Sequence, residues 1–220
     1  MQPEFWHARW RTGQIAFHQN AVDKFLSEYW ASLALSAGSQ VFVPLCGKTL
    51  DLLWLLGQGM SVAGVDLSAI ALESFCMEHG IPARRRTLGR LDVYETPRLK
   101  LFCGDFFSLT RALLGPISAV YDRAALISWA PELRAAYVEH VTSLTLPGTQ
   151  TLLIAMEYPQ AQMNGPPFSV GGGDVESLYG PKHTIRELAR RDILASEPRL
   201  RARGVTELTE VCYHLTRMGG

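Results

Sequence analysis

The clearest chemistry in this sequence comes from an apolar segment that runs into a glycine loop and a second that ends on an acid. The first, Val41–Lys48, reads VFVPLCGK and contains Gly47; the second, Val62–Ser68, reads VAGVDLS and contains Asp66. A strand, a glycine turn and an acid about 20 residues later form the plan of a nucleoside-binding βαβ unit, whose carboxylate accepts hydrogen bonds from ribose hydroxyls. We therefore expect Asp66 to bind a ribose. The alternatives are an acid that caps the next helix or a surface ion pair.

The number of glycines in the loop narrows the choice of ligand. A pyrophosphate cradle needs three glycines, for the tight turn, for close backbone approach and for helix packing, whereas only Gly47 lies in this turn. Gly47 by itself is weak support, because glycine is common at strand–helix turns for conformational reasons. The loop nevertheless favours a nucleoside without a diphosphate and disfavours an NAD-dependent oxidoreductase. S-adenosylmethionine is the commonest ligand of that description.

Two further expected strands end on charged residues. Asp105 follows Cys103-Gly104, and Arg123 follows Tyr121-Asp122. Ligands of open α/β sheets lie beyond the carboxyl ends of the strands, so Asp105 fits the adenine edge and Arg123 fits the methionine moiety or an anionic acceptor. The alternatives are an ordinary loop acid for Asp105 and an ion pair with Asp122 for Arg123, since a charge at a buried strand end needs a partner.

The composition excludes several classes of function. Lys plus Arg and Asp plus Glu both total 21 in 220 residues, so the net charge is zero and no nucleic-acid partner is implied. We expect the short basic run Arg84–Arg86 to be a solvated surface segment. The sequence has no HxxxH or HExxH metal spacing and no GxSxG nucleophile elbow. We therefore expect no metal site.

The four cysteines are far apart and form no CxxC pair, which fits a reduced setting. The first residues lack the basic and apolar regions of a signal peptide, and no apolar run reaches the ~18 residues that span a bilayer. We expect a cytoplasmic protein with no membrane partner. The absence of an obvious exposed apolar helix favours a monomer.

Strand-like apolar runs alternate with helical patterns from Gln40 onward. The expected strands are residues 41–45, 61–66, 99–103, 118–122, 149–157, 185–194 and 207–216. The expected helices are residues 50–57, 69–79, 108–114, 132–144 and 174–179, and residues 84–95 suggest a small hairpin. This alternation predicts an α/β fold, with a seven-stranded, mostly parallel sheet, helices on both faces and an antiparallel last strand.

We expect one domain over residues 1–220, with three regions. Residues 1–37 are an aromatic lid segment, residues 38–157 the cofactor-binding core, and residues 158–220 a substrate-side loop and terminal strands. Within the lid segment the periodicity predicts a helix from Asn20, as N-cap, to Leu33. Glycine and proline exclude regular structure from Gly165 to Gly173.

The chain resembles the thiopurine S-methyltransferase family, the small class I methyltransferases of bacteria and animals. The matching motifs lie along the whole chain. They are Trp6-x-x-x-Trp10-x-x-Gly13-x-x-x-Phe17-His18, Pro44-Leu45-Cys46-Gly47-Lys48, Gly64-Val65-Asp66-x-Ser68, Asp122-Arg123-Ala124-Ala125-Leu126 and Gly165-Pro166-Pro167-Phe168.

This resemblance implies an S-adenosylmethionine-dependent thiopurine S-methyltransferase. It implies cofactor contacts at Trp10, Leu45, Asp66 and Arg123, with Asp105 by the adenine. Phe17 and a late basic residue, Arg199, would approach the acceptor. The family usually has Glu where this chain has Asp66, and often His at Met60, to which we attach no function.

The expected reaction moves a methyl group to the sulfur of an aromatic or heterocyclic thiol. Such a thiol is acidic enough to need no strong protein base, which agrees with the lack of a base motif. Selenium and tellurium compounds and other small anionic nucleophiles are alternative acceptors. A non-enzymatic nucleoside-binding module is a more distant alternative.

Overall fold

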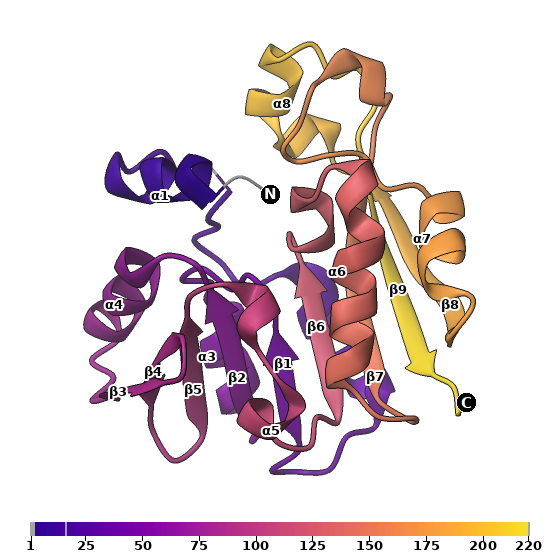
Figure 1. Ribbon diagram of the computed structural model, residues 1–220. Coiled ribbons are helices and arrows are strands. Elements are labelled where there is room, and N and C mark those ends of the chain that lie inside the picture. Colours follow the sequence, from indigo (N-terminus) through magenta and orange to yellow (C-terminus); the bar gives the residue numbers. More distant parts are fainter. Residues whose placement is uncertain (1–2, 16, 220) are drawn as a thin grey trace. The chain divides into compact units, whose positions relative to one another are not determined.

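The computed structural model describes residues 3–15 and 17–219, so residues 1, 2 and 16 of the lid segment, and residue 220, lie outside the described residues. The chain divides into two compact units, Gln2–Tyr121 and Asp122–Gly220. The helices and strands of both units are labelled in Figure 1.

The first unit holds a sheet whose strands run in the order β3-β4-β5-β2-β1-β6. Its strands are β1 (Gln40–Val43), β2 (Ser61–Asp66), β3 (Arg84–Leu88), β4 (Leu91–Glu95), β5 (Leu99–Cys103) and β6 (Ala119–Arg123), the last of which crosses into the second unit. Strands β5, β2, β1 and β6 are parallel, and their registers pair Val41 with both Val62 and Ala119. The carboxyl ends of these strands therefore meet at one edge of the sheet.

The hairpin β3–β4 is antiparallel and continues the sheet beyond β5. This confirms the predicted hairpin at residues 84–95, and with it the described residues contain nine strands rather than the predicted seven. The basic run Arg84–Arg86 is exposed on β3. Arg85 pairs with Asp92, and Arg86 pairs with Glu95, so the run is a solvated edge whose charge is largely compensated.

The helices of the first unit are α1 (Pro3–Arg11), α2 (Lys24–Tyr29), α3 (Asp51–Gly57), α4 (Ala69–Glu78) and α5 (Arg111–Leu114), with 3-10 turns η1 (Trp30–Leu33) and η2 (Phe106–Ser108). The Ser68 hydroxyl accepts from the Ala71 amide and caps the start of α4, and Gly80 follows its end with φ +60°. The predicted helix at 108–114 is split between η2 and α5.

The predicted helix from Asn20 to Leu33 was wrong at its start. Asp23, not Asn20, is the N-cap, because its carboxylate accepts from the Leu26 amide. The buried Asp51 in turn accepts from the Asp23 amide at 2.9 Å. A contact between residues 28 positions apart therefore decides where this helix begins.

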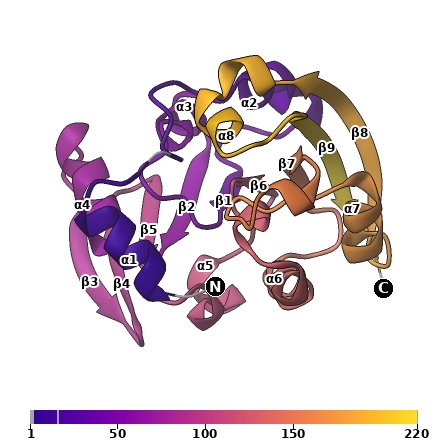
Figure 2. The same cartoon turned by 90° about the horizontal axis from the view of Figure 1, so that it is seen from above.

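Helix α1 was not predicted. It lies beside α4, beyond the end of the sheet to which β2 points (Figure 1; Figure 2). Its mean hydropathy is low, and Trp10 is its one fully buried residue. Such a short polar helix depends on tertiary contacts rather than on its own periodicity.

The second unit holds the strands β7 (Gln150–Glu157), β8 (His183–Asp192) and β9 (Thr209–Arg217). They run in the order β7-β9-β8, with β9 antiparallel to both neighbours. The last strand is therefore inserted between the two before it, which confirms the predicted antiparallel last strand. Val211, Tyr213 and Leu215 are buried, as the alternating pattern predicted.

The helices of the second unit are α6 (Pro131–Leu144), α7 (Gly172–Tyr179) and α8 (Pro198–Ala202), with 3-10 turns η3 (Leu126–Ser128), η4 (Gln160–Gln162) and η5 (Leu194–Ser196). Pro131 is the first residue of α6, where its missing N–H costs no helical hydrogen bond. Helix α7 packs against α6 and β8 (Figure 2). Leu200 of α8 belongs to an apolar cluster with Tyr158, Met163, Val205 and Leu208.

Candidate active site

Asp66, the last residue of β2, is held by the backbone on both sides of its carboxylate. Oδ2 accepts from the Gly47 amide at 2.8 Å, and Oδ1 accepts from the Ser68 amide at 2.8 Å. Burial raises the pKa of this carboxyl to about 6, although the Ser68 and Gly47 amides and nearby His7 oppose the rise. A carboxylate offers about four acceptor sites. Asp66 therefore keeps acceptor capacity for hydroxyl groups while its orientation is fixed.

Gly47 is required here for two reasons. Its φ is +51°, in the left-handed region. A Cβ at this position would also lie 3.1 Å from Cζ2 of Trp10 and 3.9 Å from Oδ2 of Asp66. Trp10, Gly47 and Asp66, three residues that the sequence predicted for one site, are thus brought together.

Leu45, two residues before Gly47, is half-buried and has a φ of +48°. This conformation is uncommon for a residue with a side chain, and such strained residues cluster at functional sites. The next residue, Cys46, is held in place by its backbone, because its amide donates to the Val65 carbonyl at 2.9 Å. The Cys46 sulfur also fills the space where a Cβ on Gly64 would lie, at 2.7 Å. The loop after β1 is therefore firmly shaped.

Phe17 lies beside the tryptophans of α1, and its side chain is 38% exposed. Its ring makes edge contacts with Trp6 at 5.4 Å and with Trp10 at 5.6 Å between centroids. Phe5 extends this cluster through an edge contact with Trp6. Phe5, Trp6, Phe17 and Trp10 therefore form one connected aromatic group that ends on Trp10.

His7 is a neighbour of Asp66 that sequence reasoning missed. It is half-buried in α1 and close enough to lower the pKa of the Asp66 carboxyl against the larger effect of burial. The sequence indicates that His7 lies near Trp10 only once α1 is known to be a helix. His7 precedes Trp10 by three residues, and that spacing puts both side chains on one helical face.

Asp105 takes a local role in the structure. Its side chain is exposed, and Oδ1 accepts from the Phe107 amide at 3.0 Å, which caps η2. This is the contact expected of an ordinary loop acid. Phe106, the next residue, is buried.

Asp122 and Arg123 end β6, and the two side chains have different environments. Asp122 is 1% exposed and accepts from the Tyr137 hydroxyl at 2.7 Å and from the Leu126 amide at 3.1 Å. Burial raises the pKa of its carboxyl to about 6. Arg123 is half-buried, and Ala124, which follows it, is in the left-handed region with φ +62°. The backbone is therefore strained directly after Arg123.

Arg199 lies on α8 of the second unit, where its side chain is exposed. The neighbouring Leu200 is buried in the apolar cluster of that unit. Arg199 is thus presented on a short helix that one apolar residue anchors.

The segment Gly165–Gly171 is irregular, as predicted, but the prediction that the irregular stretch extends to Gly173 is wrong, because α7 begins at Gly172. Gly165 has a φ of +71°, and a Cβ on it would meet the Phe168 ring at 2.4 Å. The loop is fastened at its C-terminal end, because Phe168 donates its amide to the Ile127 carbonyl and Val170 donates to the Met156 carbonyl, each at 2.7 Å.

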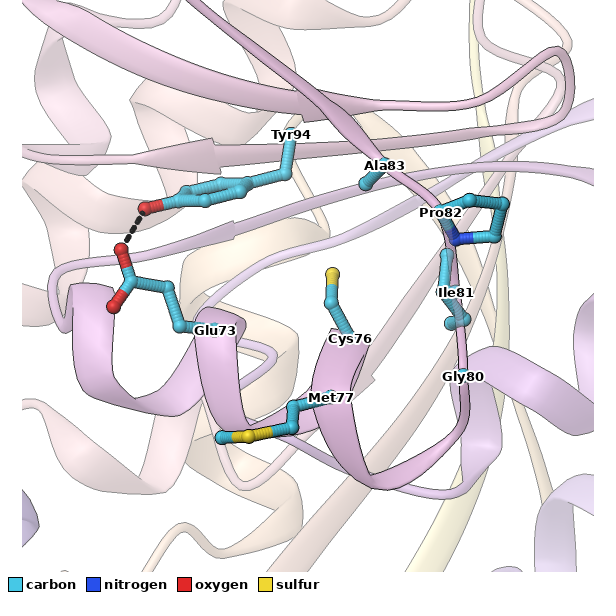
Figure 3. A pocket seen from close by; sticks show the side chains of 8 residues that line it. All are labelled: Glu73, Cys76, Met77, Gly80, Ile81, Pro82, Ala83 and Tyr94. Carbon is cyan, nitrogen blue, oxygen red and sulfur yellow. Dashed lines mark hydrogen bonds between the residues drawn. The ribbon is translucent and has the colours of Figure 1, made fainter.

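A pocket of about 370 Å³ lies between α4 and the β3–β4 hairpin (Figure 3). Figure 3 shows the Cys76 thiol directed into this hollow and the Tyr94 phenol directed to Glu73, to which it donates at 2.7 Å. Arg85 also bonds Glu73. The Glu73 carboxylate on the pocket wall therefore already has hydrogen-bond donors in Tyr94 and Arg85. None of the predicted site residues lines the pocket.

Within residues 3–15 and 17–219, no group of three or more His, Cys, Asp or Glu is arranged to hold a metal ion. In that same part of the chain, no helix combines the length and apolar character that crossing a bilayer requires.

The parallel sheet, the inserted last strand and a fixed acid at the end of β2 define the class I S-adenosylmethionine-dependent methyltransferases. The fold is similar to a methyltransferase from Thiobacillus denitrificans in complex with S-adenosyl-L-homocysteine, with a TM-score of 0.65, 15% identity and coverage of 96% of this chain and 97% of that one. It is also similar to 1,6-didemethyltoxoflavin-N1-methyltransferase of Burkholderia thailandensis, with a TM-score of 0.67, 14% identity and coverage of 99% and 87%.

The thiopurine S-methyltransferase (TPMT) family model matches residues 1–218, and the chain belongs to that family. A thiopurine S-methyltransferase of Nitrosospira multiformis is 44% identical over 215 residues, which cover 98% of both chains. One of Shewanella loihica is 44% identical over 217 residues, which cover 99% of this chain and all of the other. The resemblance stated from the motifs is confirmed.

The residues of the first unit fit S-adenosylmethionine, the cofactor of this class. The Asp66 carboxylate is oriented and has acceptor capacity for two hydroxyls of a ribose. Gly47 has no side chain, so its backbone is accessible beside Asp66, and the Trp10 indole offers an aromatic face or edge next to it. A sulfonium gains cation–π energy from such a ring.

Proposed function

We propose that this protein transfers a methyl group from S-adenosylmethionine to the sulfur of an aromatic or heterocyclic thiol of the thiopurine kind. Family membership supports the reaction class. The observation that carries the cofactor assignment is the Asp66 carboxylate, which the Gly47 and Ser68 amides hold beneath Trp10.

In this proposal Asp66 accepts from the ribose hydroxyls, while Trp10, Leu45 and Gly47 form the wall beside it. Asp105 lies by the adenine, although its contact with the Phe107 amide also gives it a structural reason to be there. Arg123 binds the cofactor carboxylate or an anionic acceptor.

Phe17 and Arg199 are the proposed acceptor contacts. Phe17 lies between Trp6 and Trp10 in an aromatic cluster and is partly exposed, so its ring is available to stack on a planar substrate. Arg199 is an exposed cation that suits a thiolate or another anionic group. Residues 1–37 act as a lid segment over the site.

The cofactor supplies a methyl group that is already activated on a sulfonium. The residues of the protein need only orient the acceptor sulfur and exclude water. Orientation of this kind accounts for roughly 7–11 kcal/mol of a reaction barrier. A thiol that is partly anionic near neutral pH needs no protein base, and no catalytic base is assigned.

The test incubates the purified chain with methyl-labelled S-adenosylmethionine and a panel of acceptors: a thiopurine, a simple aromatic thiol, selenite and tellurite. We expect label in the methyl sulfide of the thiopurine, and a loss of that product in Asp66→Ala. If label appeared only in the selenium or tellurium compounds, these compounds and not thiols would be the acceptors. Binding of S-adenosylhomocysteine without any transfer would make the chain a nucleoside-binding module.

The remaining proposals concern the protein as a whole. We propose that residues 1–220 work as one methyltransferase domain, as a monomer, on a small-molecule substrate. A cytoplasmic location is proposed from the wide spacing of the four cysteines. Sedimentation of the purified chain tests the monomer.

A further inference from the structure

The second unit contains a buried arginine, Arg134. Arg134 lies on the inner face of α6 and is 3% exposed. Its Nε donates to the Trp129 carbonyl at 3.2 Å, and its Nη2 donates to the Ser169 carbonyl at 2.7 Å. Its Nη1 lies 3.6 Å from Oδ2 of Asp174. One guanidinium thus joins Trp129 just before α6, Ser169 directly after the Gly165–Phe168 loop, and the first turn of α7.

Other side chains fasten the same loop. The Tyr158 hydroxyl donates to the Pro167 carbonyl at 2.7 Å, and the Ser169 hydroxyl accepts from the Tyr158 amide at 3.0 Å. The Gln160 side chain accepts from the Ser169 amide at 2.9 Å. The loop therefore has a single well-defined shape, which Arg134 and Tyr158 hold from different sides.

Helix α6 also holds the strand end that carries Arg123. Tyr137, three residues after Arg134, donates to the Asp122 carboxylate. The Ser128 hydroxyl donates to the Ala124 carbonyl at 2.6 Å, and Ile127 of the same segment accepts from Phe168 in the loop. Arg123 and the Gly165–Phe168 loop are consequently parts of one hydrogen-bonded assembly built on α6.

Stability alone does not explain a buried guanidinium at this place. Desolvation of a charge offsets much of what its hydrogen bonds contribute, so well-packed apolar residues often stabilise a fold as well. What an arginine adds is geometry, because its rigid fork can bond two carbonyls at fixed directions. Lysine, a point charge on a flexible stem, cannot reproduce that arrangement.

We propose that Arg134 is a positioning residue, which sets the Gly165–Phe168 loop, through Ser169 directly after it, in register with Arg123 so that the loop and Arg123 together bind the acceptor. This rests on the proposed function, since it takes the loop to be part of the acceptor wall. Arg134 itself contacts loop backbone and not the acceptor.

The test compares Arg134→Lys with Val138→Ala, a control on the same helix. Val138 is 4% exposed, one turn further along α6, so its truncation destabilises the unit without touching the loop. We expect Arg134→Lys to raise the KM for the acceptor about tenfold, within the loss that small misplacements of reacting groups produce. The KM for S-adenosylmethionine and the affinity for S-adenosylhomocysteine should stay unchanged. Val138→Ala should lower Tm and leave both KM values unchanged.

A purely structural role predicts a different pattern. Loss of folded enzyme would lower the apparent kcat and leave the acceptor KM unchanged, as in the control. That outcome for Arg134→Lys, or an equal loss of S-adenosylhomocysteine affinity, overturns the proposal. A wild-type chain that methylates no thiol would instead reject the proposed function, so the two failures are distinguishable.

A second variant keeps the proposal testable if Arg134→Lys does not fold. Tyr158→Phe removes the bond to the Pro167 carbonyl and the bond that the Gln160 side chain donates to the Tyr158 hydroxyl, and we expect a smaller rise in the acceptor KM. In the double variant the two effects should be non-additive, because both residues hold one loop. An unchanged acceptor KM in Tyr158→Phe, or strictly additive effects, would count against the positioning role.

Discussion

The indole of Trp10 lies so close to Gly47 that a Cβ on the glycine would be 3.1 Å from Cζ2 of the ring. The same glycine donates its amide to Asp66. A residue of the first helix and a residue of the first strand–helix loop are thereby fitted around one carboxylate. Most of the predictions below depend on this fit.

Gly47→Ala should reduce cofactor affinity more than it reduces stability. The added methyl must displace Trp10, and the left-handed backbone costs about 1–2 kcal/mol for a residue with a Cβ. We expect at least a tenfold loss of S-adenosylhomocysteine affinity by calorimetry. Gly59→Ala is the matched control, since Gly59 has φ +80° and nothing within 4 Å of an added Cβ. Equal affinity losses in both variants would show that Trp10 has no part in binding.

Asp66→Ala should weaken binding of S-adenosylhomocysteine by about 1.5–3 kcal/mol for each hydroxyl contact that is lost, as expected of hydrogen bonds to a charged group. Asp66→Glu should retain most of the affinity, because the family usually has glutamate here. Asp92→Ala, which removes a carboxylate that pairs with Arg85 on the hairpin, controls for charge. Undiminished affinity in Asp66→Ala would remove the ribose assignment.

Cofactor affinity should fall in mild acid. Burial raises the pKa of the Asp66 carboxyl to about 6, and only the ionised form has its full acceptor strength for the ribose. Affinity should be constant above pH 7 and decline as the pH falls through 6, by up to about tenfold per pH unit. Asp66→Asn should bind weakly and show no such decline. A wild-type profile that is flat between pH 5 and 8 would mean that the carboxylate is not the ligand group.

Phe17→Ala should impair acceptor binding with little effect on folding. The ring is 38% exposed and contacts only the lid aromatics among the ring pairs described, so its loss leaves the sheet intact. We expect a severalfold rise in the acceptor KM and a small change in Tm. Leu133→Ala, at the same 38% exposure on α6, is the control. A rise in the KM for S-adenosylmethionine alone would reassign Phe17 to the cofactor side.

Most of the elements, and the core of the site, were predictable from the sequence because their signals are local. The apolar runs that became β1, β2, β6 and β7 are buried on both faces, which leaves a continuous hydrophobic pattern. Ser68, Gly80 and Pro131 mark helix ends through their own side chains or backbone. The spacing from Gly47 to Asp66 is fixed by the length of one strand–helix–strand unit, so the sequence itself specified that the two residues would meet.

Tertiary structure alone decided the rest, because it depends on contacts between segments that are far apart in the chain. Helix α1 is short and polar on average, and its one buried side chain, Trp10, packs against Gly47. The start of α2 is set by Asp51, and the strain at Leu45 is seen only in the folded backbone. The residue type of Arg134 does not predict that its guanidinium is buried, because arginine side chains are ordinarily exposed. Its hydrogen-bond partners are backbone carbonyls, which carry no sequence signal.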